Sequence, residues 1–470
     1  MKVIPAEEFD GYWRSLSSNR AGPGQTGPGR GDPAEAAVQE IIAAVGAEGD
    51  RALRRYAALF DRSSPEKLEV DAPLAREAWR DLKAGEPELA AAMELAAAHI
   101  RRFSLEQKKQ FVDFEYEMEE GLVTGQRVIP VERAAVYAPG GRFPLVSTVL
   151  MGLIPGCVAG VGELVLASPP GADGLPDRRI LAAAALAGDL GGIFPRIFSM
   201  GGAQAIAALA LGTETVPRCD LIAGPGNKYV AAAKRLLYGR TGIDFIAGPT
   251  DVLIIAGAAF AASFPGAADL IAADMLAQAE HDGDARARVL VPQASGAALI
   301  AGILDALERR LALLPTAAVA RASLDAGGLI VSYRDREEAV RIANTIAPEH
   351  LELLAEGPES WAGGLKNYGS LFLGPLSAEA LGDYSAGINH TLPTSGSARF
   401  TGGLSVRHFL KTLTTLRCVP GPGFEAARRA AEIMAGAENL PGHARSAAAR
   451  SPGTAPPPVP GRETPREPGC

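Results

Sequence analysis

The sequence predicts an α/β fold built from two domains, each a parallel β-sheet covered by helices. From about residue 130, short apolar segments alternate with amphipathic helical segments, which is typical of parallel sheets with helical crossovers. Glycine-rich turns follow several apolar segments, as at Gly140, Gly201 and Gly224. Because ligands bind at the carboxyl ends of strands in such sheets, these turns predict where a ligand would lie. Both domains are therefore expected to be Rossmann-like.

The expected strands are short and strongly apolar. In chain order they are Arg133 to Ala138, Glu163 to Ala167, Arg196 to Met200, Asp220 to Ala223, Asp251 to Ala256, Ala287 to Val291 and Leu329 to Ser332. No GxGxxG motif follows any of them, since Gly160-Val-Gly162 lacks the third glycine. A dinucleotide would have to be held in another way.

Composition divides the chain further. Residues 1–32 read as a short lead followed by a flexible loop that is rich in Gly and Pro, and residues 33–129 as a helical arm. The two α/β domains are expected at 130–250 and 251–375, and a small helical segment at 376–450. The proline-rich tail, 451–470, is expected to be disordered.

The bulk composition indicates a globular protein that acts on small molecules. The chain has 470 residues, of which 47% are hydrophobic, and a net charge of -8, which argues against a nucleic-acid partner. Its four cysteines form no CxxC pair, which fits a reducing cytoplasm. Polar residues and prolines interrupt the apolar runs before they reach membrane-spanning length, so no membrane association is expected.

Glu349 and His350 are the strongest candidates for catalysis. Pro348 predicts a helix start, which would place both side chains in a first turn, where the helix dipole favours a neutral imidazole. A neutral histidine beside a carboxylate offers two bases at one point. Taken alone, the pair could equally be a solvated helix start.

A second set of residues has the chemistry of a metal site. The set is Gln278, His281, Asp383 and His443, whose nitrogen and oxygen donors suit zinc or a similar divalent ion. Simpler roles are open for some of them: His281 could only complement a helix end, and Glu438 and His443 could lie on an exposed helix end. His390, in the loop after Asp383, could only bond a backbone carbonyl.

Six motifs, in order, resemble the motif set of the histidinol dehydrogenase family over roughly Ala37 to Arg450. They are Tyr137-Ala-Pro-Gly-Gly141, Gly201-Gly-Ala-Gln204-Ala, Gly224-Pro-Gly-Asn227-Lys-Tyr, Gln278-Ala-Glu-His281, Ala347-Pro-Glu-His350-Leu-Glu and Gly382-Asp-Tyr384 with Asn389-His390. A match to six ordered motifs is far more specific than a match to any one of them.

The resemblance implies roles for individual residues. It implies one zinc ion per subunit, bound by Gln278, His281, Asp383 and His443, and catalytic bases at Glu349 and His350. Positions that match NAD-contacting residues are Tyr137, Gln204 and Asn227, which makes 130–250 the dinucleotide-binding domain. Positions that match substrate-contacting residues are Thr250, Gln278, His281, His350, Asp383, His390, Glu438 and His443.

The activity that the resemblance implies is the four-electron oxidation of the amino alcohol L-histidinol to L-histidine through L-histidinal, the last steps of histidine biosynthesis. His350 would remove the alcohol proton, water activated by Glu349 would add to the aldehyde, and two NAD would take the two hydrides. The resemblance also implies a homodimer, in which the C-terminal segment crosses to the partner and brings Glu438 and His443 with it.

Other functions remain open from the sequence. Thr250-Asp251 stands where the family usually has Ser-Glu, and Arg142 to Leu145 and Arg399 to Gly403 resemble sister dehydrogenases that oxidise other small alcohols, such as sulfopropanediol. Glu438 favours a substrate ammonium over a sulfonate, and so favours histidinol. A metal-dependent hydrolase, with Glu349 activating water, and a non-catalytic binding protein are the alternatives from other classes.

Overall fold

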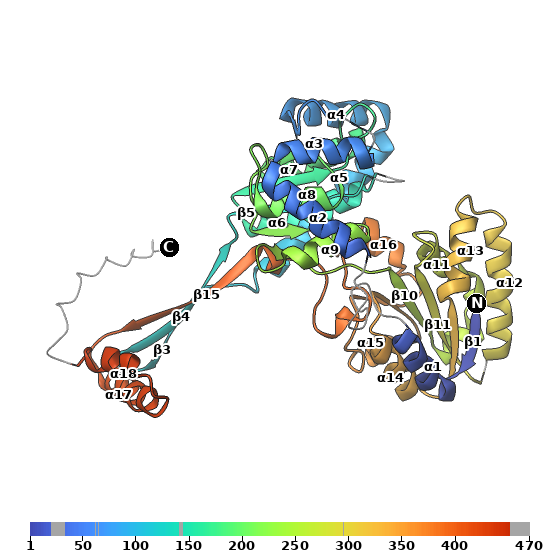
Figure 1. The fold of residues 1–470 in the computed structure, drawn as a ribbon. Helices are drawn as coiled ribbons and strands as arrows, with labels where there is room; N and C mark the ends of the chain where they lie inside the picture. Colours follow the sequence, from blue (N-terminus) through green and yellow to red (C-terminus); the bar gives the residue numbers. More distant parts are fainter. Residues whose placement is uncertain (20–32, 62, 64, 141–143, 295, 452–470) are drawn as a thin grey trace, which may run out of the picture. The chain divides into compact units, whose positions relative to one another are not determined.

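The structure is a computed structural model that describes residues 1–19, 33–61, 63, 65–140, 144–294 and 296–451 (Figure 1). The chain forms two compact units. The larger unit comprises residues 1–110 and 130–410, and the smaller comprises residues 111–129 and 411–470. Most of the expected Gly- and Pro-rich loop (20–32) and of the tail (452–470) lies outside the described residues, as do residues 141–143.

The larger unit contains two six-stranded sheets. The first has the strand order β2-β7-β6-β5-β8-β9, and all its strands are parallel except β2. Its strands are β2 Glu69–Val70, β5 Arg133–Tyr137, β6 Glu163–Ser168, β7 Arg196–Ser199, β8 Leu221–Ala223 and β9 Gly242–Ile243.

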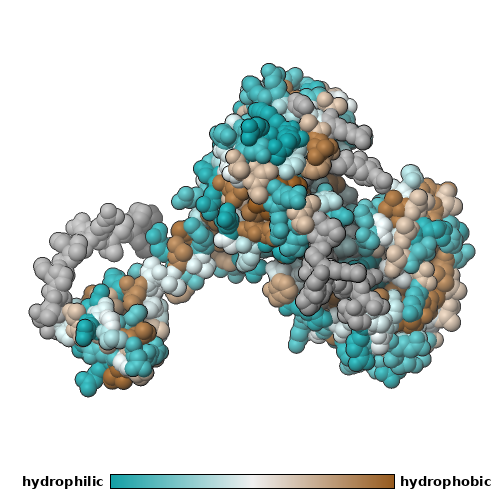
Figure 2. Space-filling view, viewed as in Figure 1, coloured by the Kyte–Doolittle hydropathy of each residue, from teal (hydrophilic) through white to brown (hydrophobic). Residues whose placement is uncertain are grey.

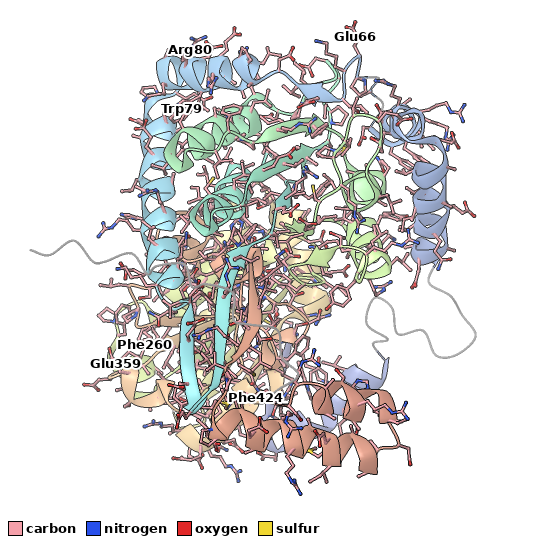
Figure 3. All side chains as sticks on the ribbon, turned by 90° about the vertical axis from the view of Figure 1, so that its left-hand side faces the viewer. Glu66, Trp79, Arg80, Phe260, Glu359 and Phe424 are labelled. Carbon is pink, nitrogen blue, oxygen red and sulfur yellow. The ribbon has the colours of Figure 1, made fainter. Side chains whose placement is uncertain are left out.

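Helices cover both faces of the first sheet, because alternate residues of each buried strand point to opposite faces. One face is covered by α4 Ala72–Gly85, α5 Pro87–Lys108, α6 Val146–Ala159 and α7 Arg178–Gly191. The other is covered by α2 Pro33–Glu48, α3 Asp50–Tyr56, α8 Gly202–Leu211 and α9 Lys228–Leu237, with a π-helical turn, η1 Ala57–Asp61, after α3. Trp79 of α4, labelled in Figure 3, is 8% exposed and packs in the first of these two cores.

The second sheet is parallel throughout, in the order β1-β12-β11-β10-β13-β14. Its strands are β1 Lys2–Pro5, β10 Asp251–Ala256, β11 Arg286–Pro292, β12 Leu329–Tyr333, β13 His350–Leu354 and β14 Ser370–Leu373. One face packs against α10 Ala258–Ser263, α11 Ala267–Ala279, α12 Gly296–Leu311 and α13 Ala317–Gly327, and the other against α1 Ala6–Asn19, α14 Arg336–Ile346 and α15 Glu359–Ala362.

After the second sheet, the chain runs through short elements to the smaller unit. They are α16 Glu379–Tyr384, η2 Ser397–Arg399 and η3 Val406–Phe409. The smaller unit is a three-stranded sheet with the order β15-β4-β3 and two helices (Figure 1). Its elements are β3 Phe114–Glu119, β4 Leu122–Pro130, β15 Leu410–Cys418, α17 Pro422–Ala437 and α18 Pro441–Ala448.

The predicted fold class is confirmed, and each of the expected strands is present as β5, β6, β7, β8, β10, β11 or β12. The segments around them differ from expectation. The lead forms β1 and α1, since Lys2–Pro5 pairs with Leu329–Ser332 and completes the second sheet. The region expected as a helical arm also contains β2, β3 and β4, and the expected C-terminal helical segment contains β15.

The helix expected at Pro348 is wrong. Helix α14 ends at Ile346, Ala347 takes a left-handed conformation (φ 51°), and β13 starts at His350. All five residues of β13 are buried between β10 and β14, which makes the segment a central strand of a parallel sheet. Glu349 and His350 therefore lie at the amino end of β13 and not in the first turn of a helix.

Candidate active site

The candidate bases lie at the amino-terminal edge of the second sheet. Asp251 begins β10, the neighbouring parallel strand, and His350 begins β13. The candidate residues Thr250, Glu349 and His350 all precede or open a strand, whereas the sequence led us to expect site residues after strands. The glycine turns of the first sheet do lie at the carboxyl ends of its strands, as described below.

Glu349 is held by two hydrogen bonds from the start of β10. Its Oε2 accepts from Thr250 Oγ1 at 2.5 Å and from the backbone N–H of Asp251 at 3.1 Å. Glu349 is 6% exposed, and burial raises the pKa of Glu349 to about 7, against the opposing effects of His350 and Thr250. A carboxylate with a pKa near neutrality can take a proton from water.

His350 is surrounded by carboxylates. Its Nδ1 lies 3.7 Å from Glu379 and 4.0 Å from Glu349, and its Nε2 lies 3.5 Å from Asp383. Neither ring nitrogen has a hydrogen-bond partner among the described residues. Burial lowers the pKa of His350, but the three carboxylates outweigh it and raise that pKa well above the ordinary value. The neutral imidazole expected from a helix dipole is therefore not what these surroundings favour.

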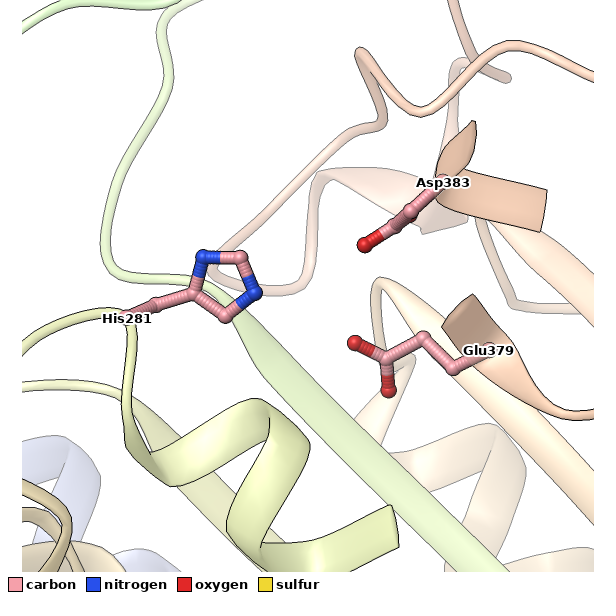
Figure 4. Close-up of side chains that lie close together, drawn as sticks. All are labelled: His281, Glu379 and Asp383. Carbon is pink, nitrogen blue, oxygen red and sulfur yellow. The ribbon is translucent and has the colours of Figure 1, made fainter. Parts of the chain in front are cut away.

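A group of possible metal ligands lies beside His350. The donor atoms of His281, Glu379 and Asp383 all lie within 4.8 Å of one another (Figure 4). His281 follows the end of α11, whereas Glu379 and Asp383 are four residues apart on α16 and so share one face of that helix. Burial raises the pKa of Glu379 to about 8, and repulsion by Asp383 and Glu349 adds to the rise. A proton or a cation among these carboxylates would relieve that repulsion.

Gln278, from the end of α11, reaches the same group. Its amide lies 2.9 Å from Thr250 Oγ1 on one side and 2.9 Å from Glu379 on the other. With its nitrogen toward Thr250, its oxygen faces Glu379 and could bind a metal; with the amide reversed, it would donate to Glu379 instead. The nitrogen and oxygen donors therefore fit a divalent cation such as zinc, which would offset the charge of the carboxylates.

Glu379 was missed in the sequence analysis. The signal was available, because Glu379-Ala-Leu-Gly-Asp383 places two carboxylates at helical spacing. A buried acidic residue in the first turn of a six-residue helix is nevertheless easily taken for a cap.

His390 is engaged on both sides. Its Nδ1 lies 3.1 Å from the carbonyl oxygen of Asp383, and its Nε2 lies 3.2 Å from Thr148 Oγ1 on α6. Since a carbonyl only accepts, Nδ1 carries the proton and Nε2 accepts from the hydroxyl. Burial lowers the pKa of His390, which agrees with a neutral ring. The Nδ1 contact is the bond to a backbone carbonyl that the sequence analysis left open for His390. Through its two contacts, His390 links α6 of the first α/β domain to the segment that carries Asp383.

Two of the expected site residues lie in the smaller unit. Glu438 follows α17, His443 is on α18, and both side chains are exposed. They are not among the residues that the larger unit brings together.

The expected cofactor positions follow three strands of the first sheet. Tyr137 ends β5 and accepts a hydrogen bond from the N–H of Gly202, Gln204 lies in the first turn of α8, and Asn227 caps α9. At Gly224 (φ 111°), a Cβ would lie 2.2 Å from the Tyr137 carbonyl oxygen, so only glycine fits. The N-termini of α8 and α9 thus lie at the carboxyl edge of the sheet, where backbone N–H groups can bind a phosphate.

Two parallel α/β domains with a buried acid–base pair and a group of metal-type ligands fit a metal-dependent dehydrogenase, and comparison with known proteins decides the class. The family model "Histidinol dehydrogenase" matches residues 29–451. The chain is a member of the histidinol dehydrogenase family.

Individual relatives agree with the family match. The chain is 46% identical over 412 residues to a histidinol dehydrogenase of Thermus thermophilus, covering 88% of this chain and 93% of that one. It is 43% identical over 413 residues to one of Prochlorococcus marinus, covering 88% and 89% of the two chains. The crystal structure of histidinol dehydrogenase from Elizabethkingia anophelis superposes with a TM-score of 0.82 at 32% identity, covering 96% and 97% of the two chains.

Proposed function

We propose that this protein oxidises L-histidinol to L-histidine through L-histidinal, with two NAD consumed per substrate, as the last steps of histidine biosynthesis. The observation that carries the proposal is the juxtaposition of two buried bases, Glu349 and His350, with the donor group of His281, Glu379 and Asp383. Two bases suit two successive oxidations, the second of which needs water to add to an aldehyde.

Gln278, His281 and Asp383 would hold one zinc ion per subunit in this proposal. When bound, zinc would hold substrate nitrogens and so orient the alcohol carbon toward the nicotinamide, which receives the hydride. A cation on these carboxylates would also oppose their effect on the pKa of His350, since they are what raises it.

The chain's own residues would divide the proton transfers. A ring nitrogen of His350 would take the proton of the substrate alcohol, because both nitrogens face the donor group and neither is engaged by another described residue. Glu349, whose pKa is raised to about 7, would take a proton from the water that attacks the aldehyde. His350 would then act a second time as the hydrate is oxidised.

Tyr137, Gln204 and Asn227 would line the NAD site at the carboxyl edge of the first sheet. The support is the close approach of Gly224 to Tyr137 and the two helix N-termini beside it. This arrangement would hold a dinucleotide without a GxGxxG turn.

A homodimer would complete the site. In the proposed assembly, Glu438 of the partner subunit binds the substrate ammonium and His443 of the partner subunit binds the metal. The smaller unit offers a surface for such an assembly, since every residue of β3 is exposed and so are Leu416, Ile433 and Met434. Figure 2 shows hydrophobic residues at the surface of this unit. Exposed apolar patches of this kind commonly mark interfaces.

Among the described residues, no helix is both long and apolar enough to cross a membrane.

The deciding experiment is to count the NADH formed per L-histidinol consumed by zinc-loaded protein, with sulfopropanediol as the competing substrate. Two NADH per histidinol are expected. Turnover of sulfopropanediol alone would overturn the substrate assignment but keep the reaction class, and a lack of NADH formation from either compound would overturn the proposed function.

A further inference from the structure

A buried ion pair lies behind Glu349, on the face of the second sheet that α1 and α14 cover. Arg288 Nη1 of β11 donates to Asp251 Oδ2 of β10 at 2.8 Å, and the two side chains are 4% and 6% exposed. Removing two charges from water is costly, so a pair at such a position calls for a role beyond its own stability.

Asp251 forms two hydrogen bonds with Glu349, the residue that acts as a base in the proposed function. Its Oδ1 accepts from the backbone N–H of Glu349 at 3.3 Å, while its own N–H donates to Glu349 Oε2 at 3.1 Å. The backbone and the carboxylate of Glu349 are thus held by one residue. The carboxylate of Asp251 would repel that of Glu349 if Arg288 did not neutralise it.

The guanidinium of Arg288 is itself held from the N-terminal helix. It lies over the ring of Trp13, 5.2 Å from the centroid, and Trp13 stacks on Phe9, which is fully buried. A planar guanidinium suits such a site, since it can stack on an aromatic ring and bind a carboxylate at once. Contacts therefore run from α1 through Arg288 and Asp251 to Glu349.

We propose that Asp251 and Arg288 are positioning residues that aim the carboxylate of Glu349, and that Trp13 of α1 supports them. The proposal rests on the proposed function, in which Glu349 serves the second oxidation only. Disturbing the pair should therefore slow oxidation of the aldehyde much more than oxidation of the alcohol.

The test uses Arg288→Met, which keeps most of the apolar stem but leaves Asp251 without its partner. Single-turnover oxidation of L-histidinol and of L-histidinal by the full-length, zinc-loaded protein separates the two steps. We expect aldehyde oxidation to fall about 10- to 100-fold, as for a small misplacement of a catalytic group, and alcohol oxidation to fall less than about threefold.

The double variant Asp251→Asn/Arg288→Met removes both charges and keeps an oxygen that can accept from the Glu349 N–H. The double variant is expected to recover most of the rate of aldehyde oxidation that Arg288→Met loses. Such a recovery would show that the two residues act as a pair, because two independent substitutions would add their losses. Arg341→Met is the matched control, because it breaks an exposed pair, with Asp10 of α1, that does not touch Asp251. It should leave both rates unchanged.

Equal loss of both oxidations in Arg288→Met, or no recovery in the double variant, would overturn the positioning role. If Arg288→Met does not fold, Trp13→Leu removes the supporting ring, keeps both charges of the ion pair and should show the same selective loss at smaller size; an unselective loss there would count against the proposal. Failure of the wild type to oxidise either compound would instead reject the proposed function on which this inference rests.

Discussion

Glu349 and His350 are neighbours in sequence, but the structure gives them different surroundings. Glu349 accepts two hydrogen bonds from Thr250 and Asp251, whereas the ring nitrogens of His350 face Glu379 and Asp383. One residue is anchored and the other faces the place where a substrate would bind. This difference supports a division of labour between the two bases.

That division predicts different losses in two variants. His350→Asn should slow both oxidations by about 10²- to 10⁴-fold, because the same base serves both steps, and Glu349→Gln should cause a loss of that size only in the second. Separate assays with L-histidinol and L-histidinal would measure this. If each variant lost both half-reactions equally, the assignment of separate roles would have to be abandoned.

Glu379 offers a test of the metal site. Because its carboxylate lies in the donor group with His281 and Asp383, Glu379→Gln should weaken zinc binding by about 10-fold or more. Competition with a chromophoric chelator would give the affinity without relying on activity. Glu280→Gln is the control, since Glu280 is exposed and next to His281 but outside the donor group, and zinc affinity should not change.

The elements show how far sequence reasoning reached. The short, strongly apolar strands of the two parallel sheets, such as Asp251–Ala256, could be predicted from pattern alone, and the glycine turns of the first sheet predict where the cofactor would lie. The segment His350–Leu354 was not, because Pro348 resembles a helix start and Glu352 interrupts the apolar run. Tertiary burial between two strands decided its conformation, and a single sequence does not reveal that burial.

Site residues divide in a similar way. Gln278, His281 and Asp383 were named from motifs, and the structure brings them to one place. Glu379 was not found, because it belongs to none of the six motifs, and its helical spacing to Asp383 does not by itself show that α16 lies beside His281. From the sequence, Asp251 is only a departure from the family pattern. Its ion pair with Arg288 depends on how β10 and β11 pair, and the sequence alone does not reveal that register.

The turn between β8 and α9 allows a prediction at the level of an element. Gly224→Ala would force a Cβ to within 2.2 Å of a backbone carbonyl at a positive φ, so it should cost about 1–3 kcal/mol of stability and weaken NAD binding. Thermal unfolding and equilibrium titration with NAD would measure both. Gly363→Ala is the control, because that glycine has helical φ and no neighbour near its Cβ position; an equal effect there would remove the special role of Gly224.

For the whole molecule, the proposed dimer makes a prediction about mixed subunits. If each site combines His350 of one subunit with His443 of the partner subunit, then His350→Asn and His443→Asn proteins should be nearly inactive alone. Mixed dimers would contain one intact site, so random reassociation should restore about a quarter of the wild-type activity. Mixing after mild dissociation, with zinc and NAD present, would measure it; a lack of any recovery would mean that each subunit builds its site alone.

The pairing of Lys2–Pro5 with Leu329–Ser332 has a consequence for how the protein is made. The chain leaves the ribosome from its N-terminus, so β1 is synthesised first but has no strand to join until β12 has emerged. The first sheet, made of residues between these two, is complete before then. The sheet of the second domain can therefore be completed only late in synthesis, when β1 pairs with β12. Contacts between residues so distant in sequence form slowly, which delays this step further.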